Sequence, residues 1–334
     1  MLTAEHFLEC CHGHGIRFVA GVPDSLLKDL CACLTDTLAA GSHLIAANEG
    51  GAVGLAAGHY LATGQPALVY MQNSGQGNAV NPLVSLADPL VYGIPMLLLV
   101  GWRGEPGKHD EPQHAKQGRI TAGLFDALGV HHEILTEDEA ALPAQIQRLL
   151  DYARANTCPV GLIVRSGTFA KYAPRNRTRS PYAIGREAAI EALLGLAPPA
   201  AAFVSTTGHI SREVYDTRMR HGDGHERDFL VVGSMGHASQ IALGLALAQP
   251  LRPVICLDGD GAALMHLGGL AIVGTSGCRN LKHVVLNNGA HESVGGQPTV
   301  AFKVSLTGVA TAAGYAWVRR VTAWDDWAPA VAEW

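Results

Sequence analysis

The sequence VICLDGDGAALMHLGGLAIVGTSGCRNLKHVVLNN, residues 254–288, decides the fold class of this chain. Residues 254–257 and 283–286 are short apolar runs with the length of buried strands. Between them, leucine, alanine and glycine recur at the spacing of one helical face, which predicts a single helix over residues 262–275. The stretch therefore predicts a strand–helix–strand unit of the kind found in parallel α/β sheets.

Each strand of this unit is followed by polar residues. Gly259, Asp260 and Gly261 follow the first strand, and Asn287 and Asn288 follow the second. Because the carboxyl ends of parallel strands lie at one edge of a sheet, we expect Asp260 and Asn288 to emerge together. Carboxylate, carboxamide and open backbone oxygens suit a hard divalent cation such as Mg²⁺ that carries a diphosphate. The stretch therefore predicts a metal–diphosphate site.

The composition is typical of a compact globular protein. The 334 residues fit roughly two domains, with 48% hydrophobic and 16% charged residues. A net charge of −5 without any basic block gives no reason to expect a nucleic-acid partner. The seven cysteines form no CxxC pair, which favours reduced thiols. Without a signal-peptide pattern or an apolar run of membrane-spanning length, we expect a soluble cytoplasmic protein with no membrane partner.

Strand and helix signals alternate along both halves of the chain. In the first half, strands are expected at residues 16–20, 44–47, 67–71, 96–100, 131–135 and 160–164, and helices at residues 25–38, 50–62 and 139–155. In the second half, strands are expected at residues 202–205, 229–232, 253–257, 283–286 and 316–318. This alternation predicts an α/β fold with two domains, each a parallel sheet with helices on both faces.

The domain boundaries follow from a polar, proline-bearing segment that lacks apolar periodicity, residues 170–181. We expect a first domain at residues 1–170, a linker at residues 171–185 and a second domain at residues 186–334. The second domain has one expected strand fewer than the first. We therefore expect it to lack a C-terminal strand, and a naturally five-stranded sheet is the alternative.

Ligands of open α/β sheets bind beyond the carboxyl ends of the strands, so the residues at those ends are candidate site residues. Taken singly, each candidate has an ordinary structural explanation. Asp24 could cap a helix, the charge of Glu49 could interact favourably with a helix dipole, and Met235 could be a core residue. These structural roles do not explain why polar residues or glycines follow so many of the expected strands in both halves of the chain. The candidates are Asp24, Ser25, Glu49, Arg103, Thr207, Gly208, Gly233, Ser234, Met235, Asp260 and Asn288.

Three motifs together resemble those of thiamine-diphosphate (ThDP) enzymes: NEGGAVGLAAG at Glu49, GSMG at Met235, and the GDG…NN pair. The resemblance covers nearly the whole chain and implies two ThDP-binding folds. The first would bind the pyrimidine ring of the cofactor, and the second its diphosphate. Larger members carry a third domain between these two, for which the linker here is too short. Because the cofactor bridges two subunits in this family, the resemblance also implies a homo-oligomer.

The resemblance also implies roles for single residues. Glu49 would exchange a proton with the pyrimidine ring, Met235 would wedge the cofactor into its bent shape, and the carbonyl of Gly233 would accept from the pyrimidine amine. Asp260, Asn288 and the backbone oxygen of Ala290 would bind Mg²⁺. The remaining cofactor contacts would come from Thr207, Gly208, Ser234, Gly259, Gly261 and Ala262. Ala262 departs from the Ser or Thr of many members, so a diphosphate contact must come from elsewhere, such as backbone N–H groups.

Further stretches resemble the simple 2-oxo acid decarboxylases of this family. Asp24, in GVPDSLLK, would face the reacting carbon, and His114, in EPQHAKQG, would relay protons. Four stretches are together similar to the branch of the family that converts 3-phosphonopyruvate to phosphonoacetaldehyde and CO₂ in phosphonate biosynthesis: GVPDSLLK, MQNSGQGNAVNPL, GSMGHASQIALGLALAQP and NNGAHESVGGQPT. Such a small, highly anionic 2-oxo acid needs cationic and N–H donors. We expect Arg103 and Ser25 to contact it.

Four alternatives stay open at this stage. A sulfopyruvate decarboxylase shares much of this pattern. A carboligase is disfavoured by the missing middle domain and by the Asp24 and His114 pair. A catalytically silent ThDP-fold partner protein is disfavoured by the intact Glu49, Asp260 and Asn288. A nucleotide-binding dehydrogenase is disfavoured because no Gly-x-Gly-x-x-Gly follows a strand and opens a helix with an acidic residue further on.

Overall fold

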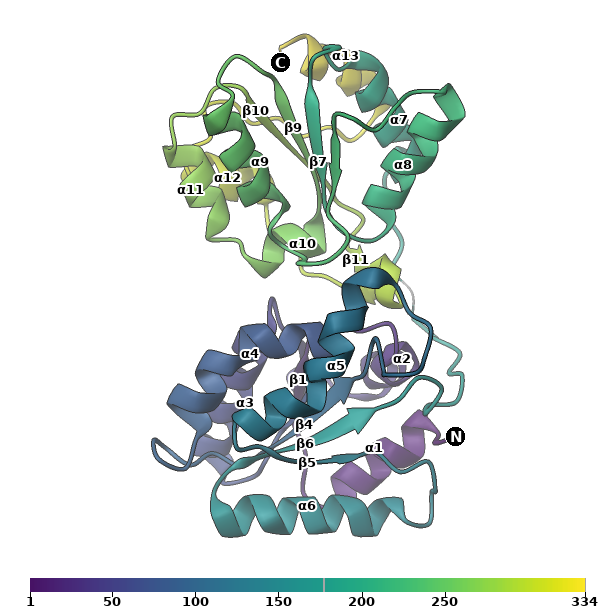
Figure 1. Cartoon of the computed structure of the whole chain (residues 1–334), viewed down its shortest axis with the longest axis vertical. Coiled ribbons are helices and arrows are strands. Elements are labelled where there is room, and N and C mark those ends of the chain that lie inside the picture. Colours follow the sequence, from purple (N-terminus) through teal and green to yellow (C-terminus); the bar gives the residue numbers. More distant parts are fainter. Residues whose placement is uncertain (177, 334) are drawn as a thin grey trace. The chain divides into compact units, whose positions relative to one another are not determined.

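The computed structural model describes residues 1–176 and 178–333 and contains two compact units. Unit 1 comprises Met1–Arg177 and Val294–Gln297, and unit 2 comprises Thr178–Ser293 and Pro298–Trp334. Each unit is an open parallel sheet covered by helices, as the alternating pattern predicts (Figure 1). The predicted linker contains residue 177 and the predicted second domain ends at residue 334, and both residues lie outside the described part of the chain.

Unit 1 has a six-stranded sheet in the order β2-β1-β3-β4-β6-β5. All six predicted strands are present, at β1 (Val19–Gly21), β2 (His43–Ile45), β3 (Leu68–Gln72), β4 (Met96–Gly101), β5 (His131–Ile134) and β6 (Pro159–Val164). The central strands β4 and β6 are buried along their whole length, which explains their continuous apolar sequences. Every strand pair in this sheet is parallel, so the carboxyl ends of all six strands lie at one edge.

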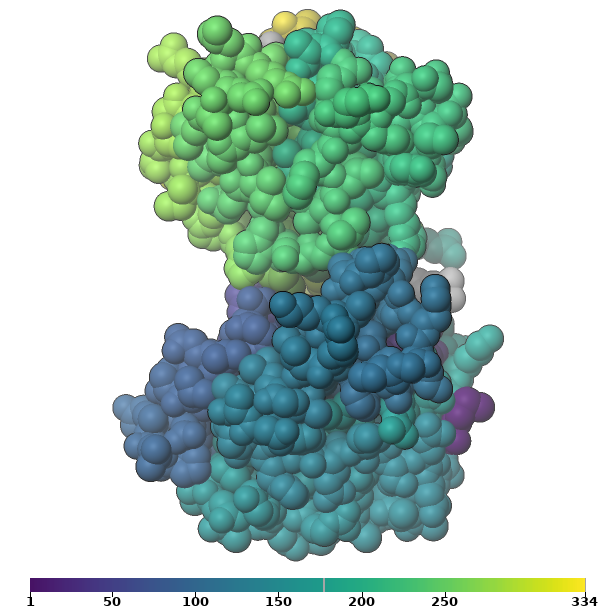
Figure 2. All heavy atoms as spheres, in the orientation of Figure 1, coloured from purple at the N-terminus to yellow at the C-terminus, as the bar shows by residue number. Residues whose placement is uncertain are grey.

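Helices cover both faces of the unit 1 sheet and form a separate apolar core on each (Figure 1). The helices of one core are α1 (Ala4–Gly13), α2 (Lys28–Thr37) and α6 (Leu142–Asn156). Those of the other are α3 (Glu49–Thr63), α4 (Gln76–Pro82), the π-helix Leu83–Ala87 and α5 (Pro112–Ala127). In the space-filling view, the visible face of this unit is formed mostly by the blue and teal parts of the chain, which include α3, α4, α5 and α6 (Figure 2).

Unit 2 has a four-stranded parallel sheet in the order β10-β9-β7-β8. Its strands are β7 (Ala202–Ser205), β8 (Asp228–Leu230), β9 (Val254–Gly259) and β10 (Leu281–Leu286). One face packs on α7 (Arg186–Leu196) and α8 (His209–His221), and the other on α9 (Ala238–Ala248). The remaining elements of unit 2 are α10 (Asp260–Met265), α11 (Gly269–Thr275), β11 (Ala290–His291), α12 (Leu306–Ala312) and α13 (Trp327–Ala332), while β12 (Gln297–Pro298) spans the boundary at which the chain passes from unit 1 to unit 2.

Two predictions for unit 2 are wrong. The single helix expected over residues 262–275 is broken into α10 and α11, because His266 leaves the helical conformation ahead of Gly268 and Gly269. Residues 316–318, expected as a fifth strand, are not paired with the sheet. Side-chain contacts hold this segment instead of a ladder: the indole N–H of Trp317 donates to Glu333 Oε2 over 2.9 Å.

Within the described residues, every helix is too short or too polar to cross a lipid bilayer. The seven cysteines, which all lie in the described part of the chain, are free thiols.

Candidate active site

In unit 1, candidate residues follow four neighbouring strands at the carboxyl edge of the sheet. Asp24 lies three residues after β1, Glu49 four residues after β2, Asn73 directly after β3, and Arg103 two residues after β4. The parallel order β2-β1-β3-β4 therefore places them along one sheet edge, as predicted from the positions of the polar turns.

Glu49 begins helix α3 and is buried. Asn48 is the N-cap of this helix, since its Oδ1 accepts the N–H of Gly51 over 2.8 Å. The Nδ2 of Asn78 donates to Glu49 Oε2 over 2.7 Å. A Cβ at Gly75 would lie 2.2 Å from Glu49 Oε1, so only glycine admits the carboxylate at this point. The Glu49 carboxylate is thus held in one position in a largely dehydrated setting.

Asp24 is fully buried just beyond β1. Its Oδ1 accepts the Nε2–H of Gln72 over 2.7 Å, and its Oδ2 accepts the N–H of Leu26 over 3.2 Å. A Cβ at Gly101 would lie 2.0 Å from Asp24 Oδ2, so this close approach requires glycine. Leu27, and not Asp24 or Ser25, is the N-cap of α2, so the helix-capping alternative for Asp24 is wrong.

Burial raises the pKa of Asp24, against the opposing effects of the Gln72 hydrogen bond and the Arg103 charge. In the folded chain Asp24 therefore keeps its proton to a higher pH than in the unfolded chain, and stability falls as pH rises through this interval. We expect the free energy of unfolding of Asp24→Asn, measured relative to the wild type, to rise by on the order of 1 kcal/mol from about pH 4 to pH 7, because the amide has no proton to lose. Urea unfolding of the variant and the wild type between about pH 4 and pH 7 measures this difference in free energy. Asp126→Asn, which changes an exposed carboxyl, is the control. A relative stability that does not rise with pH over this range contradicts the raised pKa of Asp24.

Arg103 lies in the loop after β4 beside Asp24 and Ser25. Its Nη1 donates to Ser25 Oγ over 2.8 Å, and its Nε donates to Asp110 Oδ2 over 2.8 Å. A second Arg103–Asp110 hydrogen bond makes the pair bidentate. This hydrogen bonding holds the pKa of the Asp110 carboxyl well below its usual range. The structure thus brings the predicted pair Ser25 and Arg103 together and adds Asp110, which fixes the guanidinium plane.

His114 lies in the first turn of α5, half-buried next to this cluster. Burial, and then the Arg103 charge, lower the pKa of His114, whereas Asp110 and Glu111 oppose the shift. The imidazole is therefore neutral near pH 7 and can accept a proton. Unit 1 thus collects Asp24, Ser25, Arg103 and His114 in one cluster, and holds Glu49 in a second group with residues 75–78.

In unit 2, Asp260 begins α10 at the end of β9 and is 2% exposed. The Thr299 hydroxyl donates to Asp260 Oδ2. Burial raises the pKa of Asp260, and hydrogen bonds from Thr299 and from the backbone of Asn288 oppose the shift. The carboxylate is therefore buried among hydrogen-bond donors, a setting in which a bound cation would offset the desolvation of its charge.

Asn288 follows β10, the strand that pairs with β9. Its Oδ1 accepts the N–H of Ala290 over 3.0 Å, and its Nδ2 donates to Glu292 Oε2 over 2.9 Å. Arg186 forms ion pairs with Glu292 and with Glu213. These contacts fix the carboxamide so that its oxygen faces away from Glu292.

The turn that carries Met235 has an unusual backbone. Ser234 has a φ of 52°, in the left-handed region that residues other than glycine rarely adopt. Met235 reaches the acidic turn, since its Cε lies 3.5 Å from the point where a Cβ at Gly261 would stand. Gly208 has a φ of 91°, and Thr207 Oγ1 donates to the carbonyl of Val232 over 2.9 Å. The strained turn therefore places an apolar side chain over the Gly259–Gly261 segment.

These donor sets fit the group that the sequence motifs imply. A buried carboxylate, a fixed carboxamide oxygen and nearby backbone carbonyls are hard oxygen ligands of the kind that Mg²⁺ takes. Sequence reasoning missed four residues that orient the candidates: Asn78, Asp110, Glu292 and Thr299. Gln72, which orients Asp24, has a local signal in the sequence, because it directly follows the strand expected at residues 67–71.

Two models of one enzyme family match the two halves of the chain. The family "thiamine pyrophosphate enzyme, N-terminal TPP binding domain" matches residues 1–126, and the corresponding C-terminal TPP binding domain matches residues 206–333; thiamine pyrophosphate is another name for ThDP. Phosphonopyruvate decarboxylase of Streptomyces hygroscopicus is 39% identical over 347 residues, which cover 99% of this chain and 84% of that protein.

Two further relatives cover most of the chain. Phosphonopyruvate decarboxylase of Streptomyces viridochromogenes is 39% identical over 347 residues, which cover 99% of this chain and 85% of that protein. Sulfopyruvate decarboxylase of Methanosarcina acetivorans is 28% identical over 322 residues, which cover 90% of this chain and 79% of that protein.

Proposed function

Since this chain belongs to the thiamine pyrophosphate enzyme family, we propose that it decarboxylates 3-phosphonopyruvate to phosphonoacetaldehyde and CO₂, with ThDP and Mg²⁺ as cofactors. The observation that carries the proposal is the 39% identity to two phosphonopyruvate decarboxylases over 99% of the chain. The unit 1 cluster supports it, because it combines proton-transfer groups with a fixed cation.

The cofactor assignment rests on residues of both units. We propose that Asp260, Asn288 and the carbonyl of Ala290 bind Mg²⁺, while residues of the turns at Thr207–Gly208, Gly233–Met235 and Gly259–Ala262 contact ThDP. When bound, ThDP supplies the nucleophilic carbon and the electron sink that decarboxylation requires. Glu49 would hold and return a proton at the pyrimidine nitrogen, since its carboxylate is fixed by Asn78 and shielded from water.

The remaining unit 1 residues would handle the substrate. Asp24 holds a proton more tightly than an exposed carboxyl, and His114 is neutral near pH 7, so one can donate and the other can accept a proton. Arg103 and Ser25 would bind the phosphonate. Because two Arg103 donors already bind Asp110, the head group would engage Nη1 and the Ser25 hydroxyl.

We further propose that residues 1–170 bind the pyrimidine half of ThDP, that residues 186–334 bind the diphosphate half, and that residues 171–185 link them. Family membership supports self-association into at least a dimer, which light scattering measures. The free cysteines support a reducing compartment such as the cytoplasm.

The decisive experiment compares CO₂ release from phosphonopyruvate and from sulfopyruvate, side by side, with ThDP and Mg²⁺ present. We expect phosphonopyruvate to be the preferred substrate. We expect Arg103→Ala to raise KM for it by about 10- to 100-fold, because a charge-assisted hydrogen bond is lost, with a smaller change in kcat. The matched control is Arg119→Ala, which removes an exposed arginine from the same loop-and-helix segment.

Two outcomes would redirect the proposal. Preference for sulfopyruvate would favour the second candidate function, which the relative in Methanosarcina acetivorans supports. Binding of ThDP without turnover of either substrate would identify the chain as a silent ThDP-fold partner.

A further inference from the structure

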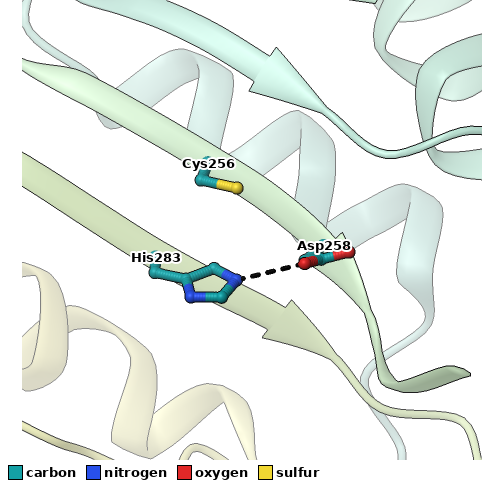
Figure 3. A group of neighbouring side chains, drawn as sticks. All are labelled: Cys256, Asp258 and His283. Carbon is teal, nitrogen blue, oxygen red and sulfur yellow. Dashed lines mark hydrogen bonds and ion pairs between the residues drawn. The ribbon is translucent and has the colours of Figure 1, made fainter. Parts of the chain in front are cut away.

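A buried polar cluster lies in unit 2 where the acidic turn leaves the sheet. Cys256 and Asp258 on β9 and His283 on β10 face one another on the same side of the sheet (Figure 3). Their candidate ligand atoms lie within 4.8 Å of one another. Asp258 directly precedes the Gly259–Gly261 turn, and His283 lies on the strand that leads to Asn288. The cluster therefore touches both strands that carry the proposed Mg²⁺ ligands.

Hydrogen bonds link Tyr315, His283, Asp258 and the N–H of Gly259 into one continuous chain, which we call the relay. The His283 ring lies 3.3 Å from Asp258 Oδ2 through Nε2 and 2.9 Å from the Tyr315 hydroxyl through Nδ1. The other Asp258 oxygen accepts the N–H of Gly259 over 3.0 Å. Asp258 and the His283 side chain are only 1% and 2% exposed, so an unmade hydrogen bond here would be costly.

One assignment of the hydrogen-bonding protons satisfies the whole relay. Burial raises the pKa of Tyr315, so its hydroxyl keeps its proton and can donate to Nδ1. With the ring proton on Nε2, His283 donates to Asp258 Oδ2, while Asp258 Oδ1 accepts from Gly259. Every polar atom of the relay is satisfied in this arrangement. A metal ion on Nε2 would displace the His283–Asp258 hydrogen bond, and Cys256 packs in an apolar cluster with alanines of α9, so a hydrogen-bonded role fits better.

The far end of the relay is anchored to the helix layer. Tyr315 follows α12, and its N–H donates to the carbonyl of Ala310 over 3.1 Å. A Cβ at Gly274 would lie 2.1 Å from the carbonyl oxygen of Ala313, so α11 and the end of α12 are in direct backbone contact. The relay therefore connects the contact between α11 and α12 to the last residues of β9.

We infer that Asp258, His283 and Tyr315 are positioning residues that hold the Gly259–Gly261 turn in place relative to Asn288. The β9–β10 ladder ends at the pair Gly259 and Leu286, so Asp260 and Asn288 lie beyond its last rung. The relay ends at the N–H of Gly259, directly before Asp260. It therefore restricts the turn residues that the hydrogen bonds between β9 and β10 no longer hold. This inference rests on the proposed role of Asp260 and Asn288 in binding Mg²⁺.

The test titrates the apo form of this chain with Mg²⁺ at saturating ThDP and follows tryptophan fluorescence. We expect Tyr315→Phe, which removes one hydroxyl, to weaken apparent Mg²⁺ affinity by about 3- to 10-fold. The kcat at saturating Mg²⁺ should stay close to wild type. The matched control, Tyr215→Phe, removes the hydroxyl of a 46% exposed tyrosine on α8 and should change nothing.

A second pair of variants separates positioning from packing. His283→Leu removes both ring contacts and should weaken Mg²⁺ affinity further, whereas His283→Gln keeps a donor and an acceptor and should restore part of it. Wild-type Mg²⁺ affinity in both Tyr315→Phe and His283→Leu overturns the inference, even if the apo-proteins unfold at lower temperature. If the wild-type protein itself binds no ThDP with Mg²⁺, the proposed function fails and the inference with it.

Discussion

Replacement of Asp260 by alanine is expected to abolish Mg²⁺-dependent retention of ThDP. Asp260 supplies the only side-chain carboxylate in the proposed ligand set, and it lies buried at the end of β9. Without it, Asn288 and the Ala290 carbonyl offer neutral oxygens alone. Since loss of an outer-shell partner alone weakens metal sites by about 10- to 100-fold, we expect loss of this ligand to cost at least about 100-fold in apparent Mg²⁺ affinity. Equilibrium dialysis of ThDP against a Mg²⁺ series measures the effect.

Two controls separate loss of the ligand from loss of the fold. Asp216→Ala removes an exposed carboxylate from α8 and should bind ThDP as the wild type does. Asp260→Asn keeps the shape of the side chain. Because burial raises the pKa of Asp260, its charge destabilises the metal-free protein at neutral pH, and the neutral amide should not lower the apo-protein's stability. If Asp260→Ala binds ThDP with the Mg²⁺ dependence of the wild type, the ligand assignment is wrong.

The parallel sheets were predictable from the sequence because the relevant signals are local. Buried parallel strands such as β4 and β6 have continuous apolar sequences, and the polar turns that follow parallel strands share one edge. The polar turns therefore predict Asp24, Glu49 and Arg103 at one edge of the unit 1 sheet, which is where they lie.

The residues that orient these groups could not be predicted in the same way. Thr299 donates to Asp260 across 39 positions of sequence, and Asn78 donates to Glu49 across 29. Neither contact leaves a periodic or spacing signal, because each depends on how loops return to the sheet edge. The helix break at His266 is also invisible to periodicity, because the apolar spacing of residues 262–275 continues across it. The pair Gly268–Gly269 is the one local sign in this stretch that a helix could end there.

The expected effect of Glu49→Gln is a loss of proton transfer with cofactor binding largely retained. Glutamine has the same shape, and its amide oxygen can still accept from Asn78, so ThDP affinity should change by less than about 3-fold, the scale of one modest hydrogen bond. Glutamine cannot exchange a proton with the pyrimidine nitrogen. We therefore expect kcat to fall by about 10²- to 10⁴-fold, the usual range for loss of a general acid–base group.

The measurement that isolates this step is hydrogen–deuterium exchange at the thiazolium C2 of bound ThDP, followed by NMR after acid quench. Exchange should slow in parallel with kcat, because both depend on the proton that Glu49 holds. Glu5→Gln, an exposed first-turn glutamate of α1, is the matched control and should exchange at the wild-type rate. Slow turnover with wild-type exchange would place Glu49 in a later step, and unchanged turnover would remove it from the mechanism, since Gly75 and Asn78 would then only be packing around a structural carboxylate.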